Sequence, residues 1–376
     1  MKAHVLHESS ADLVPEDLPR PAPGPGEVLI RVAACGVCHT DLHVIKGEVA
    51  FPRPCVLGHE VSGVVEEAGP SVSGWEPGQR VACSFIMPCG ACRHCAAGNE
   101  DLCEEFFAKN RLKGQLYDGT SRLADAAGRP VAMYSMAGLA EYAVVPATAV
   151  FALPDGIDLE DAAILGCSVF TSYGAVRNVA ELQPGETVAV VAVGGIGLNI
   201  VQMAAAHGAG RIVAVDISDE KLALARELGA TDTVNSLHGD PVAAVRALTG
   251  GRGVDVAFEA FGSGPTVKTA TELVDDGGRV VLVGIAPAGV EAGLNIAHIV
   301  RRKIRVLGSY GARASTDMPR VLELVAEGRI GLRRLITDRY EFADADRAYK
   351  DLDARRIRGR AILTYGIPDG DGSAPA

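Results

Sequence analysis

The sequence predicts a two-unit α/β protein, in which a β-rich, barrel-like unit accompanies a doubly wound parallel sheet. Three observations carry this prediction. The chain has 376 residues, which is enough for about two domains of roughly 100–200 residues each. Short strand patterns separated by Pro and Gly turns fill its first part, up to Pro154. After Thr187, apolar strand patterns alternate with helical spacers, as in a sheet built from successive βαβ units.

The first unit is expected to be mainly strand. The Pro-rich run 18–26 is incompatible with helix and indicates a surface turn. Residues 104–137 form a polar, Gly-containing stretch that is long enough to cross an interface or an active-site mouth, and both possibilities stay open. Apolar residues alternate or run continuously between turn signals in the expected strands, which are residues 2–6, 27–33, 61–69, 79–83 and 141–145.

Residues 35–60 concentrate chemically active side chains. Cys38 and His59 are a thiol and an imidazole, the ligand types that zinc prefers. Asp41 and Glu60 supply carboxylates that could hold a ligating imidazole in one tautomer. Thr40 and His43 add a hydroxyl and a titratable ring, as a proton relay requires. For Cys38 or His59 alone, a buried core residue is the simpler interpretation, but the residues downstream favour a metal site.

Four clustered cysteines predict a second metal site. In the spacing C-x2-C-x2-C-x7-C, four thiolates fit a closed tetrahedral zinc, with no position left for a substrate. An iron–sulfur cluster is the competing use of such cysteines, but nothing nearby calls for electron transfer. His94 lies inside this loop and is expected to face solvent. The four cysteines are Cys89, Cys92, Cys95 and Cys103.

A helix is expected over residues 159–179. Cys167 and Thr171 are four positions apart, so a continuous helix would place them on one face. Cys167 could then supply a third zinc ligand and leave the fourth tetrahedral position open for substrate or water. A buried helical cysteine is the alternative.

The second unit begins with a nucleotide-binding pattern. An apolar strand over 187–193 leads into the turn Gly194-Gly195-Ile196-Gly197, and a helix is expected over 198–207. Such a turn lets the N–H groups at a helix N-terminus approach a pyrophosphate. Asp216 follows the next strand, about 20 residues on, where a carboxylate accepts from the ribose hydroxyls and repels a 2′-phosphate. NAD is therefore expected rather than NADP. Ala192 stands where the first glycine of the fingerprint belongs, so the tightness of the turn is open.

Further strands and a returning segment complete the expected organisation. Residues 309–376 change pattern and are expected to return to the first unit. The predicted domains are therefore residues 1–168 with 309–376, including a metal lobe at about 89–103, and residues 169–308. Six strands in alternation make the doubly wound sheet, and the later ones are expected at 231–234, 254–259, 279–284 and 304–308.

Charge and hydropathy argue against nucleic acids and membranes as partners. The net charge is −11, from 36 basic and 47 acidic residues, which argues against a nucleic-acid surface. The apolar run 187–206 is long enough to suggest a membrane span, but its glycines favour strand–turn–helix, so no membrane partner is expected. The N-terminus has no apolar signal-peptide core, so a cytoplasmic location is expected. In such a chain, nine cysteines indicate metal binding rather than disulfides.

With these residues in place, the chain resembles the zinc-dependent medium-chain alcohol dehydrogenases of the medium-chain dehydrogenase/reductase superfamily. The similarity is collinear over nearly the whole length and is carried by C-G-V-C-H-T-D-L-H, G-H-E, the four-cysteine lobe, G-C-S-V-F-T-S-Y-G-A, the glycine turn and V-D-I-S-D-E-K-L. The resemblance implies a GroES-like catalytic barrel with a Rossmann domain, two zinc ions per chain and NAD(H). It also implies a homo-oligomer, with a dimer favoured over a tetramer.

The resemblance also assigns roles to individual residues. Cys38, His59 and Cys167 would hold the catalytic zinc, with Glu60 behind it and Asp41 supporting His59. Thr40 and His43 would form a proton relay with the nicotinamide ribose. Cofactor contacts are implied for His39 at the pyrophosphate, Thr171 near the nicotinamide, Gly194, Gly195, Ile196 and Gly197 in the turn, Asp216 and Lys221 at the adenosine ribose, and Arg360 at the pyrophosphate.

The expected reaction interconverts a small-molecule alcohol with its aldehyde or ketone by hydride transfer, with zinc as a Lewis acid. One alternative is a zinc-free reductase of conjugated C=C bonds, which would lack Cys38, His59 and Cys167. Another is a non-catalytic nucleotide-binding relative, which would be expected to lose Thr40, His43 or Asp216. A third is oxidation of a thiol adduct of formaldehyde, which needs a polar pocket. Phe51 and Phe85 favour an apolar one.

Overall fold

The computed structural model describes residues 1–8 and 10–367, which divide into two compact units. The first unit contains residues 1–167, 313–326 and 336–367, and the second contains 168–312 and 327–335. The sequence places all of 309–376 with the first unit, whereas residues 309–312 and 327–335 belong to the second. There the Gly331 N–H donates to Gln202 Oε1 at 3.1 Å, and Arg329 binds the carbonyl of Ala206. Residues 368–376 of the predicted returning segment lie outside the described residues.

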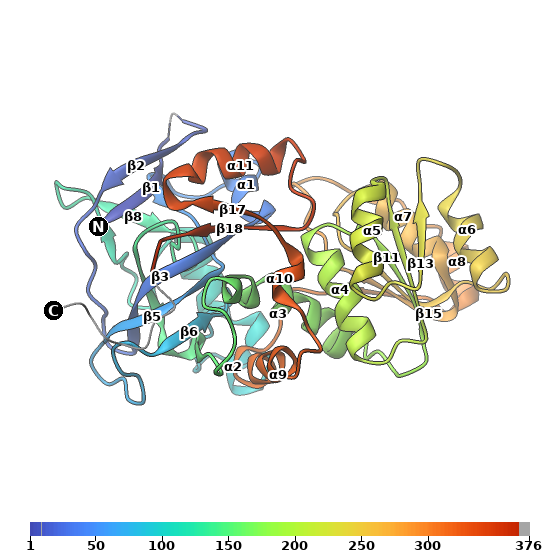
Figure 1. Cartoon of the computed structure of the whole chain (residues 1–376), viewed down its shortest axis with the longest axis horizontal. Coiled ribbons are helices and arrows are strands. Elements are labelled where there is room, and N and C mark those ends of the chain that lie inside the picture. Colours follow the sequence, from blue (N-terminus) through green and yellow to red (C-terminus); the bar gives the residue numbers. More distant parts are fainter. Residues whose placement is uncertain (9, 368–376) are drawn as a thin grey trace. The chain divides into compact units, whose positions relative to one another are not determined.

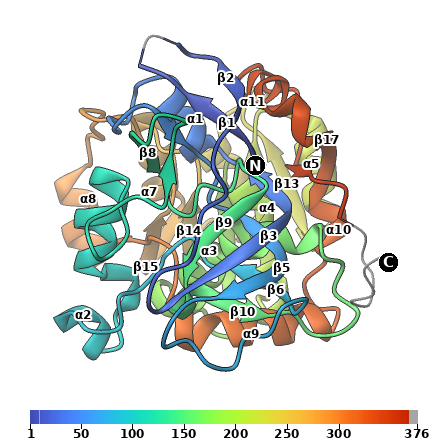
Figure 2. The same ribbon diagram turned by 90° about the vertical axis from the view of Figure 1, so that its left-hand side faces the viewer.

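The first unit is built on two sheets, so the expected β-rich, GroES-like architecture is confirmed. Strand β3 (Glu27–Val37) pairs with β5 (Val61–Ala68), β9 (Tyr142–Pro146) and β18 (Arg360–Thr364), and β3, β5 and β6 (Arg80–Cys83) lie side by side (Figures 1 and 2). One sheet has the order β2 (Leu13–Asp17), β1 (Lys2–Leu6), β4 (Cys55–Val56), β8 (Pro130–Met133) and β7 (Leu123–Ala124). The other has the order β10 (Val150–Ala152), β6 (Arg80–Cys83), β5 (Val61–Ala68), β3 (Glu27–Val37), β18 (Arg360–Thr364) and β17 (Ile336–Glu341), with β9 (Tyr142–Pro146) also on β3.

Short helices complete the first unit. Its α-helices are α1 (His39–Ile45), α2 (Arg93–Ala96), α9 (Ala314–Ala326) and α11 (Ala345–Asp353). Its 3-10 helices are η1 (Glu100–Leu102), η3 (Ala147–Ala149), η4 (Asp161–Gly166) and η6 (Phe342–Asp344), and η2 (Phe106–Arg111) is a π-helix. The segment 104–137 therefore contains η2, β7 and β8 rather than only loop.

The second unit is a six-stranded parallel sheet, as expected for a Rossmann domain. Its strand order reverses beside β11, and ligands bind at such a switch point in open parallel sheets. The order is β13 (Asp232–Asn235), β12 (Arg211–Asp216), β11 (Thr187–Val191), β14 (Val254–Glu259), β15 (Val274–Leu282) and β16 (Arg305–Gly308). The helices of this unit are α3 (Ser168–Tyr173), the π-helix η5 (Gly174–Val179), α4 (Gly195–Ala206), α5 (Asp219–Glu227), α6 (Pro241–Leu248), α7 (Gly264–Leu273), α8 (Ile296–Arg302) and α10 (Leu332–Leu335).

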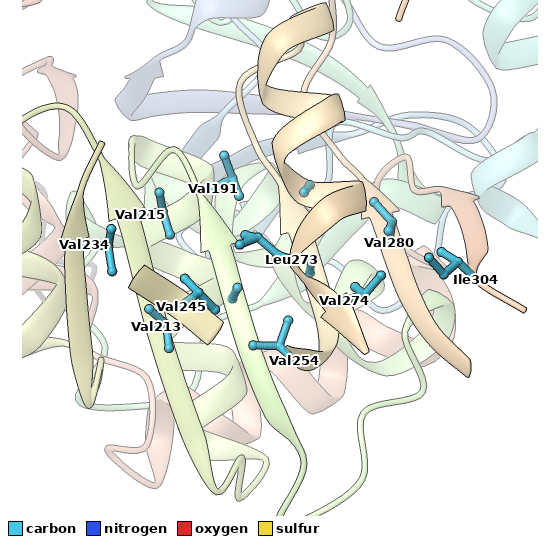
Figure 3. Packing of buried hydrophobic residues seen from close by; sticks show 13 residues of the cluster. Val191, Val213, Val215, Val234, Val245, Val254, Leu273, Val274, Val280 and Ile304 are labelled. Carbon is cyan, nitrogen blue, oxygen red and sulfur yellow. The ribbon is translucent and has the colours of Figure 1, made fainter. Parts of the chain in front are cut away.

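Both faces of this sheet are buried, which explains its continuous apolar strands. Alternate residues Val213 and Val215 enter a core with Val245 of α6 and Leu273 of α7 (Figure 3). The intervening Ala214 is also fully buried, so the opposite face is covered too. The sheet thereby holds the carboxyl ends of β11 and β12 in a fixed relation.

In the described ranges, no helix combines the length and the continuous apolar character that a bilayer crossing needs.

Candidate functional site

The first unit gathers four side chains of the types that ligate metals in its interior. The ligand atoms of Cys38, His59, Glu60 and Cys167 all lie within 4.8 Å of one another, and all four residues are buried. Segments more than a hundred positions apart thus converge on one point. A cluster of two thiols, an imidazole and a carboxylate in a dry environment is typical of a transition-metal site.

These side chains lie where strands and helices end or begin. Cys38 is extended, with φ −124° and ψ 146°, between the end of β3 and the start of α1. His59 and Glu60 directly precede β5. The continuous helix expected over 159–179 is wrong, because η4 ends at Gly166 and α3 begins at Ser168, with Cys167 between them.

Gly166 explains the break at Cys167. Its carbonyl accepts from the N–H of Phe85 at 2.9 Å, so it is used outside the helix. A Cβ on Gly166 would lie 1.8 Å from the carbonyl oxygen of Cys83 in β6. Only glycine allows this close approach, which presses the chain against the strand and interrupts the helix.

Asp41 orients the His59 ring. Its carboxylate lies 3.1 Å from His59 Nδ1 and accepts from the N–H of Gly58 and the hydroxyl of Tyr349, each at 3.1 Å. Because Nδ1 faces this carboxylate, His59 Nε2 is available to a ligand. Nε2 is buried and has no hydrogen-bond partner. An orphaned imidazole nitrogen beside two thiols fits a metal ion, with Asp41 as the outer support of the ligating ring.

The electrostatics of the cluster favour an anionic sulfur. The hydrogen bond from the Cys167 thiol lowers the pKa of Cys38 well below its ordinary value, and the same hydrogen bond raises the pKa of Cys167. Burial alone would lower the pKa of His59, but the charges of Asp41 and Cys38 outweigh it and raise that pKa. The donors are therefore poised to exchange protons for a cation. Two sulfurs and one nitrogen leave the fourth tetrahedral position of zinc open.

A buried ion pair lies against this cluster. The guanidinium of Arg360 binds Glu60 Oε1, and both side chains are at most 5% exposed. Burial raises the pKa of Glu60 to about 7, although the charge of Arg360 opposes this shift. Arg360 is thus engaged with Glu60 in this structure, and its predicted contact with a pyrophosphate stays a prediction.

Aromatic rings surround His59. The ring of Phe85 lies 6.0 Å from the His59 ring, and that of Tyr134 lies 6.2 Å from it, both edge to face. Phe51 packs against Tyr134 at 4.9 Å. Tyr134 was not predicted from the sequence, because it belongs to the segment 104–137, which contains no motif that indicates a site. The arrangement gives the cluster an apolar surrounding.

Helix α1 carries the predicted relay residues. Thr40 Oγ1 lies 3.6 Å from Cys38 Sγ, so this hydroxyl borders the metal cluster. His43 lies three positions further, on the same helix face. Its Nδ1 contacts Glu48 Oε2 at 2.5 Å, a partner that the sequence analysis missed. His39 begins the helix and is exposed.

The four-cysteine lobe forms a second cluster. The sulfurs of Cys89, Cys92, Cys95 and Cys103 lie within 4.8 Å of one another. Backbone N–H groups point at them: Cys92 donates to Cys89 Sγ at 3.3 Å, and Cys89 donates to Cys103 Sγ at 3.2 Å. Such contacts stabilise thiolates, and hydrogen bonds help to lower the pKa of Cys92 to about 6 although burial opposes it, whereas burial outweighs the N–H contacts of Cys103 and raises its pKa. Four converging thiolates fit a closed zinc site.

In the second unit, the glycine turn joins β11 to α4. Ala192 has φ +70°, the left-handed conformation that glycine usually supplies at this point. A Cβ on Gly197 would lie 2.1 Å from the carbonyl oxygen of Ala192, so the helix approaches the turn too closely for a side chain. Gly194, the N-cap residue of α4, provides no side chain that could bond the first N–H groups of the helix. The first N–H groups of α4 thus suit an anion such as a pyrophosphate.

Asp216 ties the end of β12 to this turn. Its Oδ2 accepts from the N–H of Val193 at 2.8 Å, and its Oδ1 accepts from those of Ile217 at 2.8 Å and Ser218 at 3.0 Å. A carboxylate offers about four acceptor positions, so about one remains for a ribose hydroxyl. Lys221 lies in the first turn of α5, five positions after Asp216, and is the residue predicted to bind the other ribose hydroxyl. Thr171 is buried in α3.

Comparison with known proteins agrees with both units. Residues 24–155 match the model of the alcohol dehydrogenase GroES-like domain, and residues 195–327 match that of zinc-binding dehydrogenases. The NDMA-dependent alcohol dehydrogenase of Amycolatopsis methanolica is 35% identical over 364 residues, covering 95% of this chain and 97% of that protein. The S-(hydroxymethyl)glutathione dehydrogenase of a Synechocystis species is 35% identical over 350 residues, or 91% of this chain and 94% of that protein. The structure of benzyl alcohol dehydrogenase from Acinetobacter calcoaceticus superposes with a TM-score of 0.90 at 30% identity, over 97% of this chain and 99% of that one.

Proposed function

The chain belongs to the zinc-type medium-chain alcohol dehydrogenases, and from this premise we propose that it binds two zinc ions and uses NAD(H) to interconvert an apolar alcohol with its carbonyl compound. The observation that carries the proposal is the buried cluster with the orphaned Nε2 of His59. We assign Cys38, His59 and Cys167 to the catalytic zinc. The four-cysteine lobe would hold the structural one.

The protein's own residues prepare the reaction. When bound, zinc supplies a Lewis acid that favours the alkoxide form of an alcohol, and the nicotinamide accepts a hydride. Asp41 fixes the orientation of His59, and the thiolate of Cys38 lends negative charge to the cluster. Thr40 would take the proton from the alcohol and His43 would pass it toward solvent. The aromatic surrounding of His59 excludes water from the cluster.

Cofactor choice would rest on the second unit. The N-terminus of α4 would hold the pyrophosphate and Asp216 the adenosine ribose. A carboxylate with one acceptor position left accommodates a ribose hydroxyl but repels a 2′-phosphate, which supports NAD over NADP.

The apolar shell supports an alcohol with an aromatic or aliphatic body. Phe85 and Tyr134 present ring edges to His59, and Phe51 packs on Tyr134, while the guanidinium of Arg111 lies 4.3 Å from the centre of the Tyr134 ring as a cation–π contact. Benzyl alcohol is therefore a suitable first probe, as the name of one structural relative also suggests. A cytoplasmic location stays a prediction.

A homodimer is the proposed assembly. Ile296 and Val300, four positions apart on α8, are 77% and 67% exposed. Strand β16 pairs only with β15 among the described residues, so it presents an open edge. An exposed apolar helix face next to an open edge suits a two-fold contact with a second copy. Light scattering on wild type and Val300→Asp would test this: the variant should dissociate, whereas an unchanged dimer or a tetramer would refute this contact.

The enzymatic proposal is tested by a substrate panel with each cofactor. Benzyl, primary, secondary and terpenoid alcohols and S-(hydroxymethyl)glutathione would be offered with NAD and NADP, with nicotinamide absorbance as the readout. Turnover of an apolar alcohol with NAD is expected, from protein that contains about two zinc ions per chain. Turnover of the glutathione adduct alone would replace the proposed substrate class. Absence of all turnover from protein with two zinc ions would refute the activity.

A further inference from the structure

We propose that Glu48 is a positioning residue of the proton relay, which holds the neutral His43 ring with its proton on Nδ1 and stabilises the imidazolium that forms during turnover. The proposal rests on the proposed function, because it assigns a partner to a relay residue of the same site. His43 Nδ1 contacts Glu48 Oε2 at 2.5 Å. The side chains are 21% and 29% exposed, so the pair lies between the interior and solvent.

The backbone presents Glu48 to His43. Gly47, at φ +71°, ends α1 with a left-handed residue and turns the chain back over the helix. The N–H groups of Glu48 and Val49 then both donate to the carbonyl of His43, at 2.9 and 3.1 Å. The same residue that carries the ring therefore anchors the loop that carries the carboxylate. The contact is fixed at both ends.

Neighbouring charges keep Glu48 ionised. The hydrogen bond with His43 lowers the pKa of Glu48, and the nearby Lys46 contributes to this. Lys46 Nζ lies 3.5 Å from Glu48 Oε1 and 3.0 Å from Asp353 Oδ1, at the end of α11. From the loop that follows α1, Arg53 binds the carbonyls of Val44 and Ile45 at the end of that helix.

The tautomer of His43 follows from this pairing. An ionised carboxylate only accepts hydrogen bonds, so the proton of the neutral ring lies on Nδ1. Nε2 is then the basic nitrogen. When Nε2 takes the proton released from the alcohol, the ring becomes an imidazolium held by Glu48. It then gives one proton to water, while the hydride leaves the alcohol for the nicotinamide. The carboxylate of a Ser-His-Asp triad has the same two roles: it fixes the tautomer of the histidine and stabilises its imidazolium.

A pair with the same chemistry elsewhere supplies the control. His7, directly after β1, contacts Glu16 of β2 in the same unit, with 2.5 Å between Nε2 and Oε1. Glu16→Gln removes a His–Glu contact of the same length without touching α1. Glu48→Gln removes the one beside the relay. Both pairs are partly exposed, so neither change should unfold the protein, and zinc content and Tm would verify this.

The first readout needs no substrate. In the zinc-loaded protein with ¹⁵N-labelled histidine at pH 9, where free imidazole is neutral, ring ¹⁵N shifts report the tautomer. The His43 signals are assigned by their loss in His43→Gln. We expect at least a tenfold preference for Nδ1–H in wild type and in Glu16→Gln, since a charge-assisted hydrogen bond provides that much. Glu48→Gln should lose the preference. A ring protonated on Nε2 in wild type would overturn the proposal.

The second readout is the single-turnover rate of nicotinamide reduction with an alcohol that the wild type oxidises. Glu48→Gln should slow it about 3–10-fold, a small share of what general acid–base groups contribute, with KM for the alcohol unchanged. Glu48→Asp should restore part of the rate, and Glu16→Gln should match wild type. An unchanged rate in Glu48→Gln would refute the role. Inactive wild type with the expected tautomer would instead refute the proposed function.

Discussion

Replacing Asp216 with Asn should erase much of the discrimination between NADH and NADPH. Asn keeps the shape of the side chain but removes its charge and replaces one of its two acceptor oxygens with an NH2 group. The wild-type carboxylate is held by the N–H groups of Val193, Ile217 and Ser218, so its position is fixed at the end of β12. A 2′-phosphate on the proposed ribose site would meet this charge directly.

The size of the effect follows from Coulomb's law. Two unit charges about 4 Å apart interact by ~4 kcal/mol at the surface of a protein and by ~1 kcal/mol in bulk water. Asp216 is partly exposed, so ~2 kcal/mol per unit charge is reasonable. A phosphate of charge about −1.5 then loses ~3 kcal/mol, or about a hundredfold in affinity. In Asp216→Asn a neutral hydrogen bond to the ribose replaces the charge-assisted one, so NADH binding should weaken by only about fivefold.

Fluorescence titration of NADH and NADPH measures both effects without a substrate. Wild type should prefer NADH by about a hundredfold, and Asp216→Asn should come within about tenfold of parity. Because salt screens such repulsion, the wild-type preference should shrink at 1 M NaCl. Asp219→Asn, in the first turn of α5, is the matched control and should retain the preference. Undiminished discrimination in Asp216→Asn would show that the carboxylate does not select the cofactor.

Four further changes test other parts of the structure. Cys89→Ser should reduce zinc from about two to one per chain and lower Tm by about 5–10 °C, measured by mass spectrometry of the metal and by calorimetry; unchanged values would remove the structural site. Ala192→Gly removes the strain of a left-handed alanine, ~1–2 kcal/mol, but increases the conformational entropy of the unfolded chain. The free energy of unfolding, measured with denaturant, should therefore rise by at most about 1 kcal/mol, and a decrease would contradict this expectation. Gly197→Ala should weaken NADH binding at least about tenfold in the same titration, because its Cβ would meet a carbonyl at 2.1 Å; normal affinity would refute the tight turn. A hydrogen bond from Arg122 lowers the pKa of Asp118 to about 2, so the stability that this pair provides is present above about pH 4 and is lost as pH falls toward 2. In Asp118→Asn the free energy of unfolding should therefore change less between about pH 4 and pH 2 than in wild type, by less than about 1 kcal/mol. An unaltered pH dependence would show that the pair contributes nothing.

The fold could be predicted because its signals are local. In the second unit, apolar runs of strand length alternate with amphipathic helices, and β14 was predicted with its observed bounds, Val254–Glu259. Strands β2, β4, β7, β8, β10 and β17 were not predicted. Of these, β2 and β17 lie at the ends of their sheets and carry several polar residues, so neither shows the apolar run of a buried strand. The other four have only two to four residues each, which is too short for a recognisable strand pattern.

The helix expected over 159–179 fails for a tertiary reason. Its composition suits a helix, but the carbonyl of Gly166 is taken by the N–H of Phe85, and the backbone of Cys83 leaves no room for a side chain there. A contact between segments about 80 positions apart thus decides the conformation of Cys167. No property of the local sequence reports such a contact.

In the candidate site, too, the residues in motifs were predicted and their tertiary partners were not. Motif spacing was enough to single out Cys38, His59 and Cys167, which the structure brings together. The partners that orient them depend on tertiary contacts. Tyr349 reaches Asp41 from more than 300 positions away, and the carboxylate of Glu48 reaches His43 only because the chain turns at Gly47.

The most direct test of the catalytic assignment compares zinc content and turnover in wild type and Cys38→Ser. The assignment predicts about two zinc ions per chain in wild type and about one in the variant, with the four-cysteine lobe still occupied. Turnover of the best alcohol in the panel should fall by at least about a thousandfold, because the buried cluster would lose its anionic ligand. Two zinc ions and normal turnover in Cys38→Ser would contradict the account.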